Sequence, residues 1–486
     1  MPQGSIPRVE EPPRVLGFGD MVGARVRELR LFALFFLAGL LALVGLLIVL
    51  VALRGASPSE IVERLPRFVR WILRNPLSYF LAAVPYLLSI VGRSLRRAHR
   101  RGGARALAAA FATRVALPTA AIAALGLGYR AYRHEAPVPW SHDAEARNES
   151  GRAQNLFARD GKMRGMNLVA GRRLGEAALL PLLRDNVEWI SITPFGWQER
   201  LAGTVIETNG EAGYWSESDS GIVELTRLAH ARGMRVALKL HLWVTDGGHG
   251  GGGKLAEIDP GSPDGWRAWF ASYRSFLLRY AALAESADVD LLMIGAELTR
   301  ATTKHPGEWR ALIAETRRAY HGPLTYAANW YEEAEGIEFW DLLDFIGVQA
   351  YYPLAERAGA DRAELERGWA APLATLERLH ARWGKQVLFT EVGWKSTADG
   401  AVRPWEWPED SSQLLSRVST RAQADAYEAF FRAVWPRPWF AGAYFWKWYG
   451  RHERAGGTGD PDFTPQNKPA EAVLARGFAA AAEEAR

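Results

Sequence analysis

Two glutamates stand at the ends of apolar runs that predict buried strands. Glu297 follows residues 291–296 and Glu391 follows residues 387–390, and neither run contains a charged residue. A carboxylate at the end of a buried strand costs free energy unless a neighbour neutralises it or a reaction uses it. For either glutamate alone, a hydrogen-bonded structural role is an equal alternative. Two such groups that face each other roughly 5–5.5 Å apart can cleave a glycosidic bond by double displacement.

The elements that must position these glutamates are predicted as repeated βα units. After residue 160, short β-rich runs alternate with longer amphipathic ones, which is typical of a parallel sheet covered by helices. We expect helices over residues 221–232, 265–285, 306–320, 362–382 and 421–434. We expect strands over residues 165–170, 187–194, 235–244, 289–297, 324–330, 345–352, 386–392 and 442–448. Eight parallel strands predict a (β/α)8 TIM barrel of the α/β class, with all strand C-termini at one mouth.

Polar and aromatic side chains gather where these strands end. Glu297 and Glu391 end the fourth and seventh strands, which lie on nearly opposite sides of the ring. Aromatic residues favour strands in general, but this preference does not explain why they cluster at one end of most of them. The candidate substrate-binding residues at or near strand ends are Trp197, His241, Asn329, Trp330, Tyr351, Trp394, Trp446 and Lys447.

Five segments carry a specific resemblance to a known group of enzymes. They are Arg-Gly-Met-Asn at 164–167, Ile-Gly-Ala-Glu-Leu at 294–298, Gly-Val-Gln-Ala-Tyr-Tyr at 347–352, Phe-Thr-Glu-Val-Gly-Trp at 389–394 and Phe-Trp-Lys-Trp at 445–448. Through them, residues 160–486 resemble the retaining glycosidases of clan A, which hold the acid/base on strand four and the nucleophile on strand seven. Within that clan they are similar to the β-mannanases of glycoside hydrolase family 113.

The resemblance implies roles for particular residues. Glu297 would be the acid/base and Glu391 the nucleophile. Tyr351 would donate a hydrogen bond to the nucleophile, and Trp446 would form the floor beneath the sugar being cleaved. By position alone His241, Asn329 and Trp330 are further sugar contacts, although His241 could equally be a core histidine.

One position departs from the clan. Many members have Asn just before the strand-four acid, where its amide contacts the sugar 2-hydroxyl, and this chain has Ala296. Contacts to that hydroxyl supply several kcal/mol in the transition state of comparable enzymes. The identity of the substrate is therefore open, whereas the two carboxylates are retained.

These observations predict a retaining glycoside hydrolase that cleaves a β-linked, mannan-like polysaccharide or oligosaccharide. The chain has 20 Trp, and a row of aromatic rings along an open mouth suits a polymer better than a single sugar. Transglycosylation of envelope glycans is an alternative, because the same site could pass the glycosyl group to a second sugar. A non-catalytic glycan-binding membrane protein is the alternative from another class.

Several other kinds of site are excluded or not indicated. The chain has no cysteine, which excludes disulfides and thiolate chemistry. Its ten histidines show no metal-ligand spacing, so we expect no metal and no cofactor. The glycine-rich stretch 247–254 lacks P-loop spacing and is interpreted as a loop after strand three. The net charge of +5 comes from arginines beside apolar segments near the N-terminus, which indicates a membrane and not a nucleic acid as partner.

Residues 1–135 are predicted to be a membrane region with one to three transmembrane helices, and 136–159 a linker to a catalytic barrel over 160–486. Residues 31–53 contain no charge, and a helix of that length is about 35 Å long, enough to cross a bilayer. Residues 75–91 and 106–129 are weaker candidates, for which an interfacial amphipathic helix is an alternative. A cluster of arginines lies between them, and the positive-inside rule places this cluster in the cytoplasm. If all three segments span, the barrel is extracytoplasmic and is anchored through membrane lipid. That cluster is Arg93, Arg96, Arg97, Arg100, Arg101 and Arg105.

Overall fold

The structure is a computed structural model, and it describes residues 18–53, 69, 76–136, 138–143, 145–208, 214–245, 255–408 and 416–480. The glycine-rich stretch 247–254 lies outside these residues. The chain divides into two compact units, Met1–Tyr129 and Arg130–Arg486. Each unit is described by itself.

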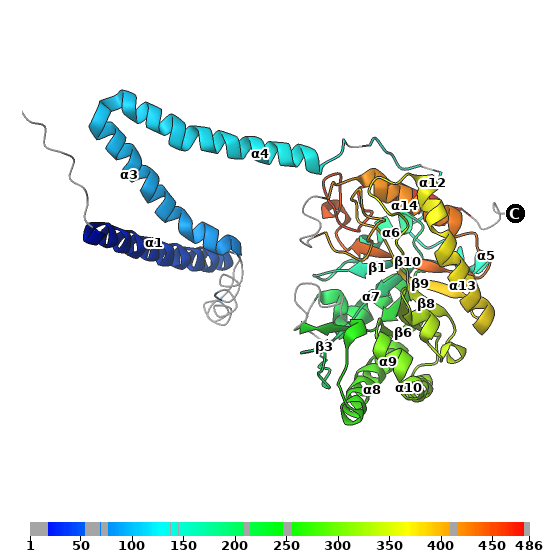
Figure 1. Cartoon of the computed structure of the whole chain (residues 1–486). Helices are drawn as coiled ribbons and strands as arrows, with labels where there is room; N and C mark the ends of the chain where they lie inside the picture. The colour runs from blue at the N-terminus through cyan, green and yellow to red at the C-terminus, as the bar shows by residue number, and fades with distance from the viewer. Residues whose placement is uncertain are drawn as a thin grey trace, which may run out of the picture. The chain divides into compact units, whose positions relative to one another are not determined.

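Long helices make up the described part of the N-terminal unit (Figure 1). They are α1 (Phe18–Leu53), α3 (Pro76–Phe111), a π-helical turn at Ala112–Ala116 and α4 (Leu117–Arg133). Gly102 and Gly103 interrupt α3 with non-helical backbone angles, so the helical part that carries the predicted span at 75–91 ends near them. Two described segments, Glu28–Leu46 and Leu81–Arg133, are long and apolar enough to cross a membrane, with mean hydropathies of 2.4 and 1.5.

Helices α1 and α3 pack against each other. A Cβ atom on Gly39 would lie 2.4 Å from the Ala82 carbonyl oxygen, so the two backbones approach closely there. The rings of Phe36 and Tyr79 stack with centroids 6.2 Å apart. At the far end of the contact, the Arg93 guanidinium lies 3.1 Å from the Glu28 carboxylate. The contact therefore runs from one end of the apolar segments towards the other.

The second unit is the predicted barrel. Eight parallel strands close in the order β1-β10-β9-β8-β7-β6-β4-β2, and helices lie outside them (Figure 1). The strands are β1 (Met163–Val169), β2 (Trp189–Ile192), β4 (Arg235–Lys239), β6 (Leu291–Ala296), β7 (Leu324–Asn329), β8 (Ile346–Gln349), β9 (Val387–Val392) and β10 (Phe440–Tyr449). The longer helices are α7 (Asp219–Ala231), α8 (Pro263–Ser286), α10 (Pro306–Ala319), α12 (Arg362–Gly368), α13 (Ala370–Trp383), α14 (Thr420–Ala433) and α15 (Pro469–Ala479). The (β/α)8 fold class is confirmed.

The third predicted strand differs from the structure in an informative way. Residues 235–244 form two strands, because the chain leaves the barrel after β4 and continues as β5 (His241–Val244). There it pairs in parallel with β3 (Phe195–Gln198), which follows β2 in the same manner. This two-stranded sheet extends the wall of the barrel at its carboxyl end, and it is separate from the barrel itself.

The barrel has one core outside its wall and another inside it. Alternation along each strand sends successive side chains to opposite faces. The inner cluster fills the barrel with buried residues contributed by six strands, whereas the larger outer cluster packs between strands and helices. The inner cluster comprises Met163, Trp189, Ala237, Leu291, Met293, Leu388, Ala441 and Tyr444.

The predicted linker, residues 136–159, belongs to the second unit and packs against the barrel where the structure describes it. The Asn148 backbone N–H donates to the Arg184 carbonyl at 3.0 Å, and Ala153 donates to Arg232 at 2.9 Å. The His142 ring lies 3.8 Å from the buried Glu471 carboxylate. This stretch is therefore held against the barrel at several points.

Candidate active site

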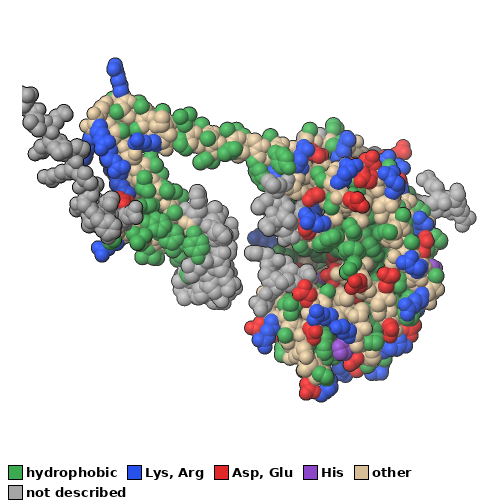
Figure 2. All heavy atoms as spheres, in the orientation of Figure 1, with side chains coloured by type: hydrophobic (Ala, Val, Ile, Leu, Met, Phe, Trp, Pro, Cys, Tyr) green, Lys and Arg blue, Asp and Glu red, His purple; other side chains and the backbone are tan. Residues whose placement is uncertain are grey.

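A cavity of about 530 Å³ opens at the carboxyl ends of the barrel strands. In the space-filling view, hydrophobic side chains gather along a hollow in this unit (Figure 2). The cavity contains both predicted catalytic residues. Its lining consists of Thr193, Phe195, His241, Trp243, Glu297, Asn329, Trp330, Tyr331, Gln349, Tyr351, Glu391, Trp405, Trp407, Trp446 and Phe463.

A bulge in β9 turns Glu391 into this cavity. Val348 of β8 pairs with Phe389, but the next residue Gln349 pairs with Glu391, so Thr390 is an extra residue in β9. Strict alternation from the inward Leu388 would point Glu391 at the helices. An extra residue reverses the alternation and re-aims the following side chain, as bulges do beside active sites.

Glu391 is 6% exposed, and its carboxylate accepts hydrogen bonds from two sides. The Tyr351 hydroxyl donates to Oε2 at 2.6 Å. The Lys239 ammonium forms an ion pair with Oε1. A buried carboxylate with a cationic partner and a phenolic donor is suited to attack as an anion.

Glu297 lies one residue beyond β6 in a different environment. Its φ of 55° falls in the left-handed region, which non-glycine residues rarely adopt and which is often found at functional sites. Burial, followed by the negative charges of Glu391 and Glu333, raises the pKa of Glu297 to about 8, against the opposing effects of Lys239 and a Gln349 hydrogen bond. The group is therefore protonated at neutral pH and can act as a general acid.

Lys239 links the two sides of the barrel beneath the cavity. Its side chain is fully buried, and its ammonium also donates to Asn167 Oδ1 at 3.0 Å. The Asn167 amide in turn donates to the Tyr444 carbonyl at 3.2 Å. Burial lowers the pKa of Lys239, and the charge of Glu391 opposes that effect. The ammonium lies 5.1 Å from the centre of the Trp446 ring.

His241 begins β5 and lines the cavity as a neutral side chain. Its Nδ1 lies 2.7 Å from the Leu242 carbonyl oxygen, which can only accept, so Nδ1 carries the proton. Burial, aided by the Lys239 charge, lowers the pKa of His241 to about 4. This tautomer leaves Nε2 as an acceptor for a hydroxyl group.

A second buried carboxyl, Glu333, supports the acid from below. It lies in α11 (Glu333–Gly336) and is fully buried. Its Oε1 accepts from the Tyr326 hydroxyl at 2.8 Å, and that hydroxyl accepts from the Leu298 backbone N–H at 2.6 Å. Its Oε2 accepts from the Asn329 backbone N–H at 2.7 Å. Glu333 thus joins the segment after Glu297 to the segment that carries Asn329.

Aromatic side chains form much of the wall. Trp330 stacks on Trp405 with ring centroids 5.5 Å apart. Trp407 meets Trp446 edge to face at 6.2 Å. Trp405 and Trp407 are 45% and 37% exposed, which leaves much of each ring available to a ligand. Faces of this kind stack on flat apolar surfaces such as those of sugar rings.

The structure brings seven of the predicted site residues into the cavity and places three elsewhere. Trp197 is half-buried and packs beside Trp243, with ring centroids 6.0 Å apart. Trp394 is 1% exposed and lies in the outer core. The Lys447 ammonium lies 3.4 Å from Asp462 and 4.7 Å from the Trp407 ring. The seven in the cavity are His241, Glu297, Asn329, Trp330, Tyr351, Glu391 and Trp446.

Sequence reasoning assigned no role to Lys239, Glu333, Trp405 or Trp407. A signal for Lys239 existed, because this charged residue directly follows the apolar residues 236–238 and shares the inward parity of Ala237. No local pattern marks Trp405 and Trp407, which come from a long connection after β9.

Comparisons with known proteins agree with this geometry. The family model of Glycoside Hydrolase Family 113 matches residues 173–468, more than half of the chain. A β-mannanase of that family from Alicyclobacillus acidocaldarius, solved in complex with ManMIm, is 29% identical, with a TM-score of 0.56 over 65% of this chain and 97% of the other. A β-1,4-mannanase of the same family is 25% identical, with a TM-score of 0.55 over 65% and 98%. No protein with a curated description matches. The chain belongs to glycoside hydrolase family 113.

Proposed function

We propose that the protein cleaves a β-linked, mannan-like polysaccharide with retention of configuration, using Glu297 as acid/base and Glu391 as nucleophile. One observation carries the proposal: two carboxyl groups with opposite surroundings line the same cavity. Glu297 has its pKa raised to about 8, whereas Glu391 has a cationic partner and a phenolic donor. A buried carboxyl group that keeps its proton can serve as the acid, and a carboxyl group held by an ammonium and a phenol can serve as the nucleophile.

The reaction proceeds in two displacements. Glu391 attacks the anomeric carbon while Glu297 donates its proton to the leaving glycosidic oxygen, which gives a glycosyl-enzyme ester and a free sugar end. Glu297, now ionised, takes a proton from water as that water attacks the anomeric carbon, and Glu391 leaves as a carboxylate. Tyr351 and Lys239 hold the Glu391 carboxylate in place before it attacks.

The aromatic wall and the family support a mannan-like polymer as substrate. The solved relatives are named as β-mannanases, and a cavity of about 530 Å³ flanked by exposed Trp405 and Trp407 suits more than one sugar ring. Ala296 stands where many clan members have an Asn and therefore offers no side-chain amide. Gln349 supplies an amide in the cavity instead. Its Oε1 is buried and has no hydrogen-bond partner within the described structure, so it can accept from a substrate hydroxyl.

We further propose that the N-terminal region, residues 1–135, anchors the enzyme in a membrane and that the barrel acts outside the cytoplasm. The break at Gly102 and Gly103 divides Leu81–Arg133 into two parts, and these make three crossings together with Glu28–Leu46. The arginine cluster next to the break marks the cytoplasmic side, so three crossings from a cytoplasmic N-terminus support this topology. The substrate would then be an envelope or external glycan.

The test uses the full-length protein in detergent with β-1,4-linked manno-oligosaccharides. Glu297→Gln should lower kcat about 10²–10⁴-fold on the natural linkage. It should retain rapid glycosylation on an aryl glycoside whose phenol leaves without protonation. Glu391→Gln should be inactive on both substrates. Glu335→Gln, an exposed carboxylate on the same helix as Glu333, is the matched control.

Two further measurements decide the mechanism. Proton NMR of the first product should show the β-anomer, as retention requires. A mechanism-based fluoroglycoside should label Glu391 in peptide maps. An α-anomer, or a label on another residue, contradicts the assignment. Ala296 favours a glycan-binding role as the second candidate, and binding without turnover that neither variant changes would establish it.

A further inference from the structure

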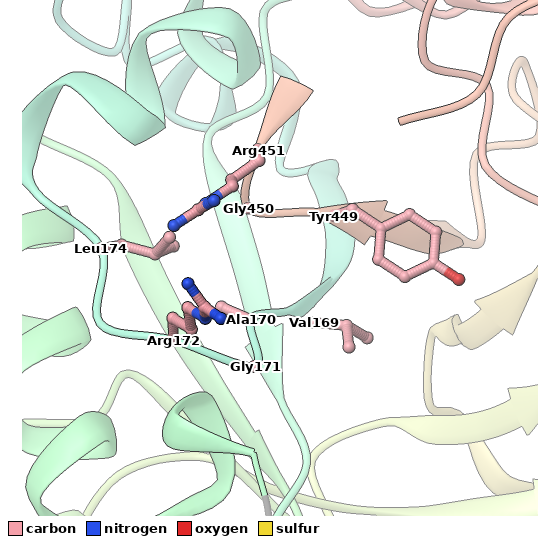
Figure 3. Close-up of a pocket in the computed structure, with 8 residues that line it drawn as sticks. All are labelled: Val169, Ala170, Gly171, Arg172, Leu174, Tyr449, Gly450 and Arg451. Atoms are coloured by element: carbon pink, nitrogen blue, oxygen red, sulfur yellow. The ribbon is translucent and has the colours of Figure 1, made fainter. Parts of the chain in front are cut away.

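A second cavity lies beside the catalytic one, at the carboxyl ends of β1 and β10. Its volume is about 230 Å³, and the segments that follow the two strands form it (Figure 3). Leu174 and Ala170 give it an apolar floor, and both are buried. Its lining consists of Val169, Ala170, Gly171, Arg172, Leu174, Tyr449, Gly450 and Arg451.

Hydrogen bonds fix both walls of this cavity. The Gly450 backbone N–H donates to the Val169 carbonyl at 3.0 Å and ties one wall to the other. Ala170 exchanges bonds with Ser216, whose hydroxyl accepts from the Ala170 N–H at 3.0 Å. The Tyr449 N–H donates to Gln466 Oε1 at 2.7 Å. The cavity is therefore preformed.

A glycine keeps the cavity open. A Cβ atom on Gly450 would lie 2.7 Å from one methyl group of Leu174 and 2.8 Å from the other. Any side chain at this position would enter the space between the walls. The shape of the cavity thus depends on the absence of a side chain at residue 450.

Two arginines define the electrostatics of the cavity. Arg172 and Arg451 are exposed, and Figure 3 shows their guanidinium ends turned towards the space beside Leu174. The lining contains no acidic residue, and within the described part of the chain neither guanidinium has a carboxylate within 4 Å. The adjacent Arg173 differs, because it lies 3.4 Å from Glu224. Two like charges directed at one space repel each other, and an anion placed between them relieves that repulsion.

The position of the cavity relates it to the substrate. Trp446 and Tyr449 lie on the same strand, three residues apart, and line the catalytic cavity and the second cavity respectively. At about 3.3 Å per residue, they are separated by roughly 10 Å along the strand. A glycan that rests on Trp446 and continues along this sector of the mouth would therefore reach Arg172 and Arg451.

We propose that this second cavity is a subsite for an anionic group, a carboxylate or a phosphate, carried by the glycan substrate at a sugar beyond the one that is cleaved. The apolar floor receives the face of the sugar, and the two guanidinium groups bind the oxyanion. The inference rests on the proposed function, because it assumes that a glycan occupies the neighbouring catalytic cavity.

The test compares two ligands with the same backbone. The hexamer of β-1,4-linked mannuronate differs from β-1,4-mannohexaose by a carboxylate in place of each C6 hydroxymethyl group. Binding of both is measured by calorimetry with full-length protein in detergent at pH 7, in a Glu297→Gln background that slows cleavage. We expect the charged hexamer to bind about tenfold more tightly than the neutral one, the gain from one charge-assisted contact.

The variants distinguish binding by Arg172 and Arg451 from a general attraction of the anion to positive charge. The double variant Arg172→Gln/Arg451→Gln should bind both hexamers equally, whereas Arg173→Gln should keep the preference. Inorganic phosphate should compete with the charged hexamer in the parent and in Arg173→Gln, but not in the double variant. The inference is overturned if the parent binds the charged hexamer no more tightly than the neutral one. It is also overturned if the double variant keeps the parent's preference for the charged hexamer. Phosphate binding without any oligosaccharide preference also overturns it, because the site would then take a free anion. Failure of mannohexaose to bind in any variant would instead count against the proposed function.

Discussion

The pH dependence of the reaction depends on the groups around Glu297. Its pKa is raised to about 8 by burial and by the charges of Glu391 and Glu333, so the acid form is lost as pH rises through that value. The alkaline limb of kcat/KM is therefore expected near pH 8. Burial raises the pKa of Glu333 to about 7, so its negative charge is present over the range in which Glu297 titrates.

Glu333→Gln should move this alkaline limb to lower pH. Without the negative charge of Glu333, the ionised form of Glu297 is less disfavoured, and its pKa falls. A pH profile of kcat/KM on an oligosaccharide measures the shift. Glu335→Gln removes an exposed carboxylate from the same short helix and should leave the limb unchanged. If the alkaline limb of kcat/KM lies at the same pH in the parent and in Glu333→Gln, then Glu333 supports the fold and does not influence the pKa of Glu297.

Lys239→Met should lower kcat about 10²-fold, the typical effect of removing one preorganised electrostatic contact. Methionine fills a similar volume but leaves the buried Glu391 carboxylate without its cationic partner. Because Lys239 lies beneath the cavity and does not line it, KM should change much less than kcat. Steady-state kinetics with a mannan oligosaccharide separate the two parameters. A variant with raised KM and unchanged kcat would place Lys239 in substrate binding instead.

At the scale of elements, the hydrophobic pattern was sufficient to predict the barrel. The eight strands are short runs rich in apolar residues. Glu297 and Glu391 are recognisable in the sequence because each follows an apolar run without a compensating charge. The family-specific segments then separated acid from nucleophile. These signals are local in sequence. They predict a shared site because the carboxyl ends of all barrel strands meet at one mouth.

Features that depend on pairing between strands could not be predicted in the same way. The bulge at Thr390 is a property of how β9 pairs with β8 and β10, and alternation alone would have sent Glu391 outward. The transfer of residues 241–244 from the barrel to a second sheet depends likewise on pairing with β3. Trp394 shows the limit of position along the strand as a guide. Its place near a strand end predicts that it lies at the mouth, but its side chain lies in the outer core.

Close pairing of β7 and β8 makes one glycine a test of barrel packing. A Cβ atom on Gly347 would lie 2.1 Å from the Tyr326 carbonyl oxygen, so the strands must separate to admit it. Gly347→Ala should lower the free energy of unfolding by about 3 kcal/mol, as overpacking does. Gly307→Ala is the matched control, because nothing lies within 4 Å of the added atom. Chemical denaturation of both variants measures the difference, and equal stabilities would contradict the register of β7 and β8.

At the scale of the whole molecule, a catalytic barrel is joined to a helical unit of different composition. The α1 helix has 36 residues, about 54 Å at 1.5 Å per residue, which exceeds the thickness of a bilayer core. Its apolar side chains Leu34, Leu37 and Leu41 are exposed. Large exposed apolar surfaces are rare on helices that face water. This contrast supports the proposal that the unit lies in lipid.

The packing of α1 on α3 provides the test of that proposal. The close approach at Gly39 and Ala82 is typical of helices that associate in membranes through small residues. The chain has no cysteine, so a pair introduced at Phe36 and Tyr79, whose rings stack, would report contact without background. In isolated membranes this Phe36→Cys/Tyr79→Cys protein should resist alkaline extraction and form an intramolecular crosslink with a short thiol reagent.

Adding Gly39→Leu should abolish the crosslink, because the Cβ of the new leucine would meet the Ala82 carbonyl. Gly45→Leu should preserve the crosslink, because its Cβ would meet nothing within 4 Å. Release of the protein by alkali would contradict the membrane anchor, and a crosslink that survives Gly39→Leu would contradict the packing of the two helices.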